Sequence, residues 1–446
     1  MSVDPESPDL RWRRRSANTL GYAGDVDAAI DQLGSLIVDM RGVLGEADRE
    51  TLSARVALAH WVGVSGGAAE AVRQLEELLP VCERALGPDD RLTLAVRNNL
   101  AFSLGETGRV ATAIEQFERL LIDRTRVLGP DAPDTLLTRG NLARSLEMAG
   151  RLDVAIEQLE LLVLDQVRVN GPDAGHTLIA RSNLAFAIGR AGRIATAIEQ
   201  TELLVIDKTR VLGAQAPSTL MTRSHLARWL IENGQVTQAI EQLEQLLDDQ
   251  TRVLGTDAPA TLTARHNLAF ALGETGQHKA AILQHQQLLL DRTRILGRDA
   301  PATLLTRNNL ALWLKRSGRI EEAIEHFELL LADQRRVLDP DASAIFVTRN
   351  NLAHAHGKAG RSLNAVAEFE LLLADQRRAL GHDAPSTFLT RNNLAHWRAK
   401  AGQLDTAITE YRELVADHHR IHGPDARATQ RAERNLAALL KRNPIR

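Results

Sequence analysis

Glycine recurs every 42 residues through this chain, from Gly24 to Gly402, with no insertion or deletion between the copies. Alanine keeps the same spacing from Ala29 to Ala407, and so does leucine from Leu36. Ten matches in register at each of three positions exclude coincidence. A fixed period of this length is typical of a repeat array, in which each unit packs only on its neighbours. We therefore expect ten copies of one small unit rather than two or three globular domains.

The apolar pattern inside one period predicts two helices. Within residues 93–129, Leu100 and Leu104 share one face of a first helix, because they are spaced at i and i+4. Phe117 and Leu120 lie in the same way on one face of a second helix. One helix pair cannot cover its own apolar faces, so the units must stack.

Glycine and proline mark the ends of these helices. Gly108 and Gly129 can adopt the left-handed conformation that ends a helix, and Pro130 cannot continue one. Asp134 or Thr135 can then cap the first helix of the next unit. The segment between them is a short loop between units.

The expected fold class is therefore all-α, a right-handed α-solenoid of ten antiparallel helix pairs plus a C-terminal capping helix. We assign residues 1–8 to a short N-terminal tail and residues 9–427 to the ten 42-residue repeats. Residues 428–446 form the capping helix and a tail, because they repeat the first-helix pattern alone.

The charge balance excludes some classes of partner. The chain has 54 Lys and Arg against 57 Asp and Glu, a net charge of -3, and only 3% aromatic residues. This composition favours neither nucleic acid nor an acidic membrane surface as a partner. No apolar run is long enough to span a membrane or to serve as a signal peptide, and the single Cys82 fits a reducing compartment. We expect a cytoplasmic protein.

The repeat motif resembles a known family. The pattern N-L-A-x6-G-x4-A-[IV]-x3-[FL] is similar to tetratricopeptide repeats, and L-G-P-D-A-P at 42-residue spacing is similar to their kinesin-light-chain variant. Actinobacterial repeat arrays, some attached to signalling ATPases of the STAND class, also resemble it. The resemblance runs from about Leu10 to Lys441 and implies binding of a peptide or protein. One departure is Arg97, which stands where the family has a large apolar residue.

An asparagine stripe follows the repeat. The resemblance places it on the groove-lining face, where such amides hold the backbone or carboxylate of a peptide. An amide offers both a donor and an acceptor, which suits a peptide backbone of any sequence. Equally, the same side chains can bond to neighbouring helices and only fix the stacking. The candidate groove residues of this stripe are Asn99, Asn141, Asn183, Asn267, Asn309, Asn351 and Asn393.

A second period of 84 residues lies within the first. Phe102, Phe186 and Phe270 have this spacing, with Arg144 and Arg228 between them. On the groove-lining face they would alternate apolar and basic anchors, and such anchors dominate binding energies. Tryptophan has the same spacing, and packing between helices is the favoured interpretation for it. These tryptophans are Trp229, Trp313 and Trp397.

Arginine and aspartate also form ladders. Arg139 lies one turn before a core leucine, so it should be partly buried and need a partner. Asp123 and Arg139 are equally far from the loop near residue 131, hence at one level of two antiparallel helices. We predict Asp123–Arg139, Asp165–Arg181 and their equivalents as ion pairs between repeats.

No set of residues with catalytic spacing is present. There is no H-E-x-x-H and no G-x4-G-K-[ST], and Cys82 has no evident base. Surface histidine is a commoner explanation than a metal site for the clustered histidines. We expect no enzyme, no cofactor and no metal. The histidines considered were His354, His356, His396, His418, His419 and His422.

The sequence thus predicts a scaffold or adaptor that binds a peptide or protein segment in the concave groove of a tetratricopeptide superhelix. The alternative is a regulatory or sensor subunit of a signalling system whose effector enzyme is a separate chain. The expected partner is a protein or peptide, not nucleic acid or membrane. Such similar repeats would also allow a homo-oligomer, because they can stack end to end or exchange between chains.

Overall fold

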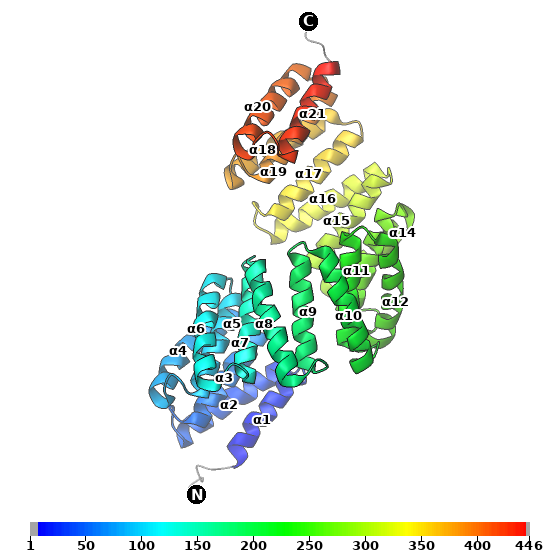
Figure 1. The fold of residues 1–446 in the computed structure, drawn as a ribbon. Helices are drawn as coiled ribbons and strands as arrows, with labels where there is room; N and C mark the ends of the chain where they lie inside the picture. The colour runs from blue at the N-terminus through cyan, green and yellow to red at the C-terminus, as the bar shows by residue number, and fades with distance from the viewer. Residues whose placement is uncertain (1–7, 443–446) are drawn as a thin grey trace. The chain divides into compact units, whose positions relative to one another are not determined.

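A computed structural model describes residues 8–442, and this part of the chain holds 21 α-helices and no strand (Figure 1). They form ten helix pairs followed by one single helix, as the repeat predicts. The first helices of the pairs are α1 (Pro8–Tyr22), α3 (Arg49–Val64), α5 (Arg91–Glu106), α7 (Pro133–Met148), α9 (Gly175–Arg190), α11 (Pro217–Glu232), α13 (Pro259–Glu274), α15 (Pro301–Arg316), α17 (Ser343–Lys358) and α19 (Pro385–Lys400). The second helices are α2 (Val26–Val43), α4 (Ala68–Leu86), α6 (Val110–Leu128), α8 (Leu152–Asn170), α10 (Ile194–Leu212), α12 (Val236–Leu254), α14 (His278–Leu296), α16 (Ile320–Val337), α18 (Ser362–Leu380) and α20 (Leu404–His422), and α21 (Arg427–Arg442) follows.

The chain divides into two compact units, residues 1–225 and 226–446, and the boundary falls inside α11. Within each unit every helix packs mainly on the helices before and after it in sequence, which makes each unit an all-α solenoid. Neighbouring first helices also contact each other, for example α3 with α5 and α15 with α17. The repeat period gave no sign of this division.

Glycine ends the helices where the sequence predicts. Gly108 follows α5 with φ +83°, and Gly129 follows α6 with φ +93°, both in the left-handed region that favours glycine. Asp339 occupies the position of Gly129 in a later repeat. There α16 ends at Val337, and Leu338 takes an extended conformation instead.

The expected cap of α7 is wrong. Its N-cap residue is Ala132, which makes no side-chain capping bond, and Pro133 is the first helical residue. Proline begins a helix well because it has no N–H to satisfy. Thr135 therefore lies within the first turn, and its hydroxyl donates to the carbonyl oxygen of Gly129 at 2.9 Å.

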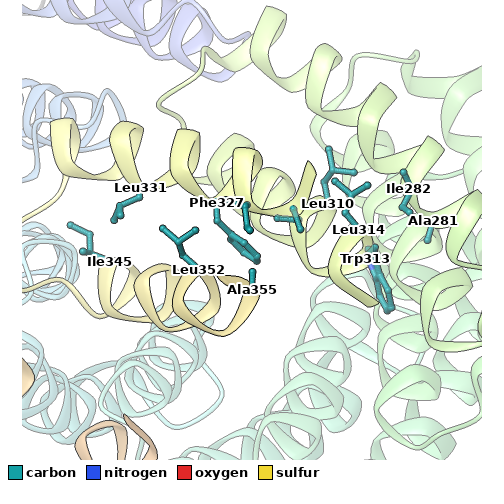
Figure 2. Close-up of a cluster of buried hydrophobic side chains, with 13 residues drawn as sticks. Ala281, Ile282, Leu310, Trp313, Leu314, Phe327, Leu331, Ile345, Leu352 and Ala355 are labelled. Atoms are coloured by element: carbon teal, nitrogen blue, oxygen red, sulfur yellow. The ribbon is translucent and has the colours of Figure 1, made fainter. Parts of the chain in front are cut away.

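Each core cluster joins side chains of three or four successive helices. In Figure 2, Leu310 and Leu314 of α15 lie beside Phe327 of α16, and Leu352 of α17 approaches from the next repeat. Phe327 is fully buried, as is the repeated alanine Ala323 beside it. A small residue at that position lets helix backbones approach closely.

Tryptophans of the 84-residue period pack against glycines of the preceding first helix. A Cβ atom added to Gly273 would lie 2.5 Å from the ring of Trp313, and one added to Gly357 would lie 2.5 Å from the ring of Trp397. Both rings are buried. The packing interpretation of these tryptophans is confirmed, and the glycines are its necessary complement.

Candidate functional site

The arginine and aspartate ladders form ion pairs within a repeat, not between repeats. Arg97 bonds Asp123 at 2.7 Å and Arg181 bonds Asp207 at 2.8 Å, always 26 residues apart. The predicted pairing of Asp123 with Arg139 is wrong, because Arg139 bonds Asp165 instead; the pairing of Asp165 with Arg181 fails likewise. The further rungs are Arg13–Asp39, Arg265–Asp291, Arg307–Asp333, Arg349–Asp375 and Arg391–Asp417.

The direction of the side chain around the helix decides this pairing. Asp123 lies level with both Arg97 and Arg139, so height along the helix does not distinguish them. The next residue, Arg124, reaches both neighbouring first helices: its guanidinium donates to the hydroxyl of Thr138 of α7 at 2.8 Å and to the carbonyl oxygen of Leu94 of α5 at 3.3 Å. Successive helical residues are about 100° apart, and Asp123 is turned from Arg124 toward the side of α5, where Arg97 lies.

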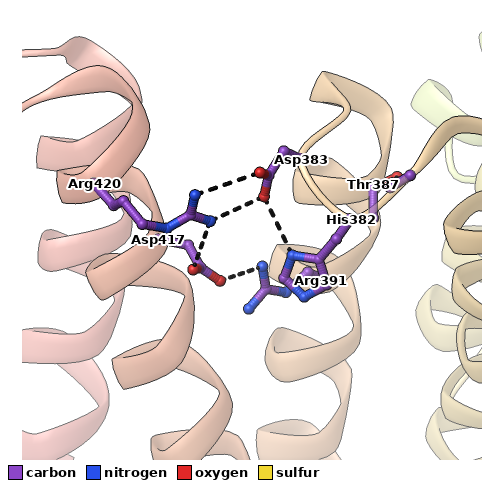
Figure 3. A network of polar contacts seen from close by, with 7 residues as sticks. His382, Asp383, Thr387, Arg391, Asp417 and Arg420 are labelled. Atoms are coloured by element: carbon purple, nitrogen blue, oxygen red, sulfur yellow. Dashed lines mark hydrogen bonds and ion pairs between the residues drawn. The ribbon is translucent and has the colours of Figure 1, made fainter.

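Most rungs extend to a loop between repeats, as Figure 3 shows for Asp417. Arg420 bonds Asp417 at 3.1 Å and Asp383 of the loop at 3.0 Å, while Arg391 bonds the other oxygen of Asp417 at 2.8 Å. Hydrogen bonds from the arginines hold the pKa of the matching Asp207 below its usual range. The network ties a loop and two helices together, and it is architectural.

Three buried cations cross between repeats at 84-residue spacing. Arg124, Lys208 and Arg292 are almost fully buried, and hydroxyls and carbonyls of adjacent helices surround their charged ends. The ammonium of Lys208 donates to the hydroxyls of Ser182 at 2.7 Å and Thr222 at 2.9 Å. Burial, aided by the positive charge of Arg181, lowers the pKa of Lys208 to about 8.

Replacing Lys208 with methionine is expected to stabilise the protein at neutral pH. The unfolded lysine titrates near pH 10.4, above the folded value, so burial of the charge opposes folding fully below about pH 8 and less as pH rises toward 10.4. The variant should gain on the order of 2 kcal/mol at pH 7, and the gain should vanish near pH 10. Denaturant unfolding of both proteins at several pH values measures it. A variant less stable than the wild type at pH 7 would contradict this account.

The asparagine stripe makes an amide ladder between repeats. Asn141 donates to the side-chain oxygen of Asn98 at 3.3 Å, and Asn393 donates to that of Asn350 at 3.3 Å. Asn309 bonds His266, whose pKa burial lowers to about 3, so the ring is neutral and can accept. These amides hold adjacent first helices together, as the stacking interpretation proposes.

The other asparagines are used less in stacking. Asn99 accepts only a long contact of 3.5 Å from Asn98, and Asn351 accepts from Lys315 at 3.3 Å. Among the described residues, no side-chain hydrogen bond is formed by Asn183 or Asn267. Their amides are the ones that the ladder leaves unoccupied.

The aromatic and basic residues of the 84-residue period partly cover one another. The guanidinium of Arg144 lies 4.9 Å from the ring centre of Phe102 and bonds Glu106 at 2.8 Å. The ring of Phe186 lies tilted against that of His225, with their centres 4.9 Å apart, and Phe270 meets Trp313 edge-on with ring centres 5.8 Å apart. Arg228 bonds Glu232 at 2.9 Å. Phe102 alone of the three phenylalanines is exposed.

An exposed apolar row lies one turn before the asparagines, and the sequence analysis missed it. It could have been found from the same period, because these residues share one repeat position, four residues before that of the asparagine stripe. Each is about half exposed although it is a large aliphatic residue. The row consists of Leu137, Ile179, Met221, Leu305, Val347 and Leu389. We call this row, the asparagines and the Phe102 series together the first-helix face.

A groove of about 640 Å³ opens on this face between α7, α8 and α9. Leu136, Leu162 and Ala180 line it at depth, and these residues are buried. It brings together three of the predicted site residues, Asn141, Arg144 and Asn183. A smaller groove of about 260 Å³ occupies the same repeat position between α19, α20 and α21.

The clustered histidines make ring contacts. His418 stacks on Phe388 at 4.5 Å, and His354 meets Trp397 edge-on at 5.4 Å. Among residues 8–442, no group of three potential metal-ligating side chains comes together. Nor does any described helix have the length and apolarity needed to cross a membrane.

Stacked helix pairs that repeat the same side chains at fixed positions define a helical repeat protein. Family models described as tetratricopeptide repeat match residues 50–121, 92–163 and 218–289, and a second such model matches residues 303–341. Together these ranges cover about half of the chain. The chain belongs to the tetratricopeptide repeat family. Membership supports a protein-interaction scaffold, and the fold is typical of proteins that are not enzymes.

Several solved structures are similar to this chain. The nearly identical TPR-like repeats of a putative kinesin light chain from Podosopora anserina are 28% identical to this chain and cover 46% of it and 97% of their own chain, with a TM-score of 0.43. BtubC from P. vanneervenii is 19% identical over 51% of this chain and 91% of its own, with a TM-score of 0.45. The apo quorum sensor NprR from B. thuringiensis is 14% identical over 82% of this chain and 99% of its own, with a TM-score of 0.55. A search of curated proteins found no match.

Proposed function

We propose that this protein is a scaffold that binds an extended segment of another protein along the first-helix face. One observation carries the proposal: each compact unit leaves large aliphatic side chains half exposed beside its row of amides. They are Leu137, Ile179 and Met221 in the first unit and Leu305, Val347 and Leu389 in the second. Groups of exposed apolar side chains mark binding surfaces. Amides can bond a peptide backbone whatever its sequence, and the aliphatic row can take its side chains.

The asparagines differ in whether their amides are hydrogen-bonded within the protein, and this difference supports the same proposal. Asn141 and Asn393 are occupied in the ladder, whereas Asn267 is not, and Asn99 is engaged only by a long contact. A surface built only for stacking would leave no reason for an amide at the unoccupied positions, because asparagine is a poor helix-interior residue.

Replacing Asn99 and Asn267 together with alanine is expected to weaken peptide binding without loss of stability. Two hydrogen bonds of about 1 kcal/mol each correspond to roughly a 30-fold loss of affinity. The probe is a set of peptides selected from a random phage-displayed library on the wild-type chain. Fluorescence anisotropy gives the dissociation constants, and circular dichroism gives the melting temperature.

The matched control replaces Asn141 and Asn393. These amides join helices, so alanine there should lower stability by about 1–2 kcal/mol. Unchanged binding by the Asn99 and Asn267 variant would count against the proposed role of the amides. Failure to select any peptide on the wild-type chain would count against the proposed function as a whole.

A further inference from the structure

The amide ladder is interrupted at several repeats, and at one of them glycine replaces the partner residue. Asn141, Asn309 and Asn393 each bond the side chain that lies 43 residues earlier. For Asn183 the residue at that spacing is Gly140, which has no side chain. The bonded rungs have asparagine or histidine at this position, and no other repeat has glycine there. The gap leaves the amide of Asn183 exposed.

The groove between α7, α8 and α9 lies at this gap. Gly140, Asn141 and Asn183 all line it. A Cβ atom added to Gly140 would meet only the side chain of Leu162, at 3.5 Å, which is an ordinary contact. Space for a side chain therefore exists at residue 140, and the sequence leaves it empty there.

A second departure from the repeat lies on the same groove. Asn170 occupies a repeat position that is leucine in the other repeats. The one further exception is His422, which lines the smaller groove. Asn170 donates to the side-chain oxygen of Gln166 at 2.6 Å, and both residues line the groove. Departures from the repeat thus gather around one cavity, as expected where a repeat is specialised for a ligand.

The lining indicates the chemistry of an occupant. Aliphatic side chains lie at depth, and four neutral amides surround them: Asn141, Gln166, Asn170 and Asn183. Two of the charged groups at the groove are already paired, Asp131 with Arg168 at 2.5 Å and Arg144 with Glu106. A charged side chain placed at depth would find no counter-ion among Leu136, Leu162 and Ala180, so burying it would oppose binding.

We infer that this groove takes a bulky uncharged side chain, aliphatic or aromatic, of the extended segment that binds the first-helix face. This inference rests on the proposed function, and it adds where the main apolar side chain of the bound segment is held. The amide of Asn183, released from the ladder by Gly140, bonds the backbone on either side of that anchor. The repeats with a closed ladder provide the rest of the contact surface.

Gly140→Asn tests the inference, because it fills the slot and supplies the missing partner of Asn183. Peptides selected from the random library on the wild-type chain are titrated against the full-length variant. The expected loss of affinity is about 10-fold or more, since one large apolar side chain loses its pocket. Gly140→Ala, with a smaller side chain, should lose less. Gly42→Asn, an exposed helical glycine of α2 with nothing within 4 Å, is the matched control and should bind as the wild type.

The outcomes separate the two proposals. The selected peptides should share one large apolar residue, and changing it to alanine should weaken binding to the wild type but add little to the loss in Gly140→Asn. Equal affinity of the wild type and Gly140→Asn would overturn the inference while leaving the proposed function standing. A conserved charged residue in place of the apolar anchor would overturn it as well. If no peptide binds the wild-type chain, both proposals fail.

Discussion

Replacing Trp313 with alanine is expected to lower the free energy of unfolding by about 3–5 kcal/mol. The indole is 2% exposed and belongs to the cluster that joins α14, α15, α16 and α17 (Figure 2). The loss comes from the removed apolar surface and from a cavity that rigid helices on three sides cannot close. Guanidinium unfolding followed by far-UV circular dichroism gives the change. Because repeat arrays unfold in parts, hydrogen exchange should place the loss in α13 to α17.

Gly273→Ala supplies the control. Its effect on stability should change sign when Trp313, the residue that Gly273 packs against, is replaced by alanine. In the wild type, Gly273→Ala puts a Cβ atom 2.5 Å from the ring of Trp313, so we expect destabilisation by about 1–3 kcal/mol. In the Trp313→Ala background the clash is gone, and alanine should stabilise the helix by about 0.5–1 kcal/mol. Gly105→Ala, whose Cβ atom would lie 3.8 Å from Ala113, should be neutral or stabilising in any background. The same effect of Gly273→Ala in both backgrounds would contradict the proposed contact.

The helices could be predicted because their signals are local. Gly108 and Gly129 mark both helix ends with a left-handed backbone that other residues rarely adopt. Periodicity then fixes which face is buried, as for Leu100 and Phe117. The division of the chain within α11 could not be predicted, because the repeat motif continues through it without change.

Tertiary partners were harder to predict than the residues that need them. The side chain of Arg139 was expected to be partly buried and to form an ion pair, and both expectations are correct. Its partner was misassigned because two aspartates lie at the same level, and only the rotation of the helix selects Asp165 over Asp123. The Arg–Asp bridge to the loop, as from Arg168 to Asp131, was missed because no local signal links residues 37 apart.

The candidate site shows the same limit. The sequence identified the asparagine stripe but could not tell which amides are occupied, because Asn141 and Asn183 look alike until the residue 43 positions earlier is considered. The aliphatic row of Leu137 and Ile179 could have been found, since exposed apolar residues at a fixed repeat position are visible in the sequence. The groove at Gly140 could not, because its depth depends on how α7, α8 and α9 pack.

Replacing Asp333 with alanine is expected to be as damaging as losing Trp313, by about 3–5 kcal/mol. Asp333 is fully buried, whereas the matching Asp123 is 30% exposed. The difference comes from Arg298, an arginine that no other repeat has at this position and that covers the carboxylate together with Arg307 and Arg336. Without the carboxylate, the half-buried Arg307 keeps its charge but loses its counter-ion.

The matched comparison is Asp383→Ala, which removes a carboxylate bonded to Arg420 where both side chains are at least half exposed (Figure 3). Water screens that pair, so the loss should stay within about 1 kcal/mol. Asp333→Asn keeps the shape but not the charge, and should fall between the two. Denaturant unfolding at low and high salt measures all three, because screening should weaken the Asp383 effect and leave the Asp333 effect nearly unchanged. Equal losses for Asp333→Ala and Asp383→Ala would mean that burial does not set the strength of these pairs.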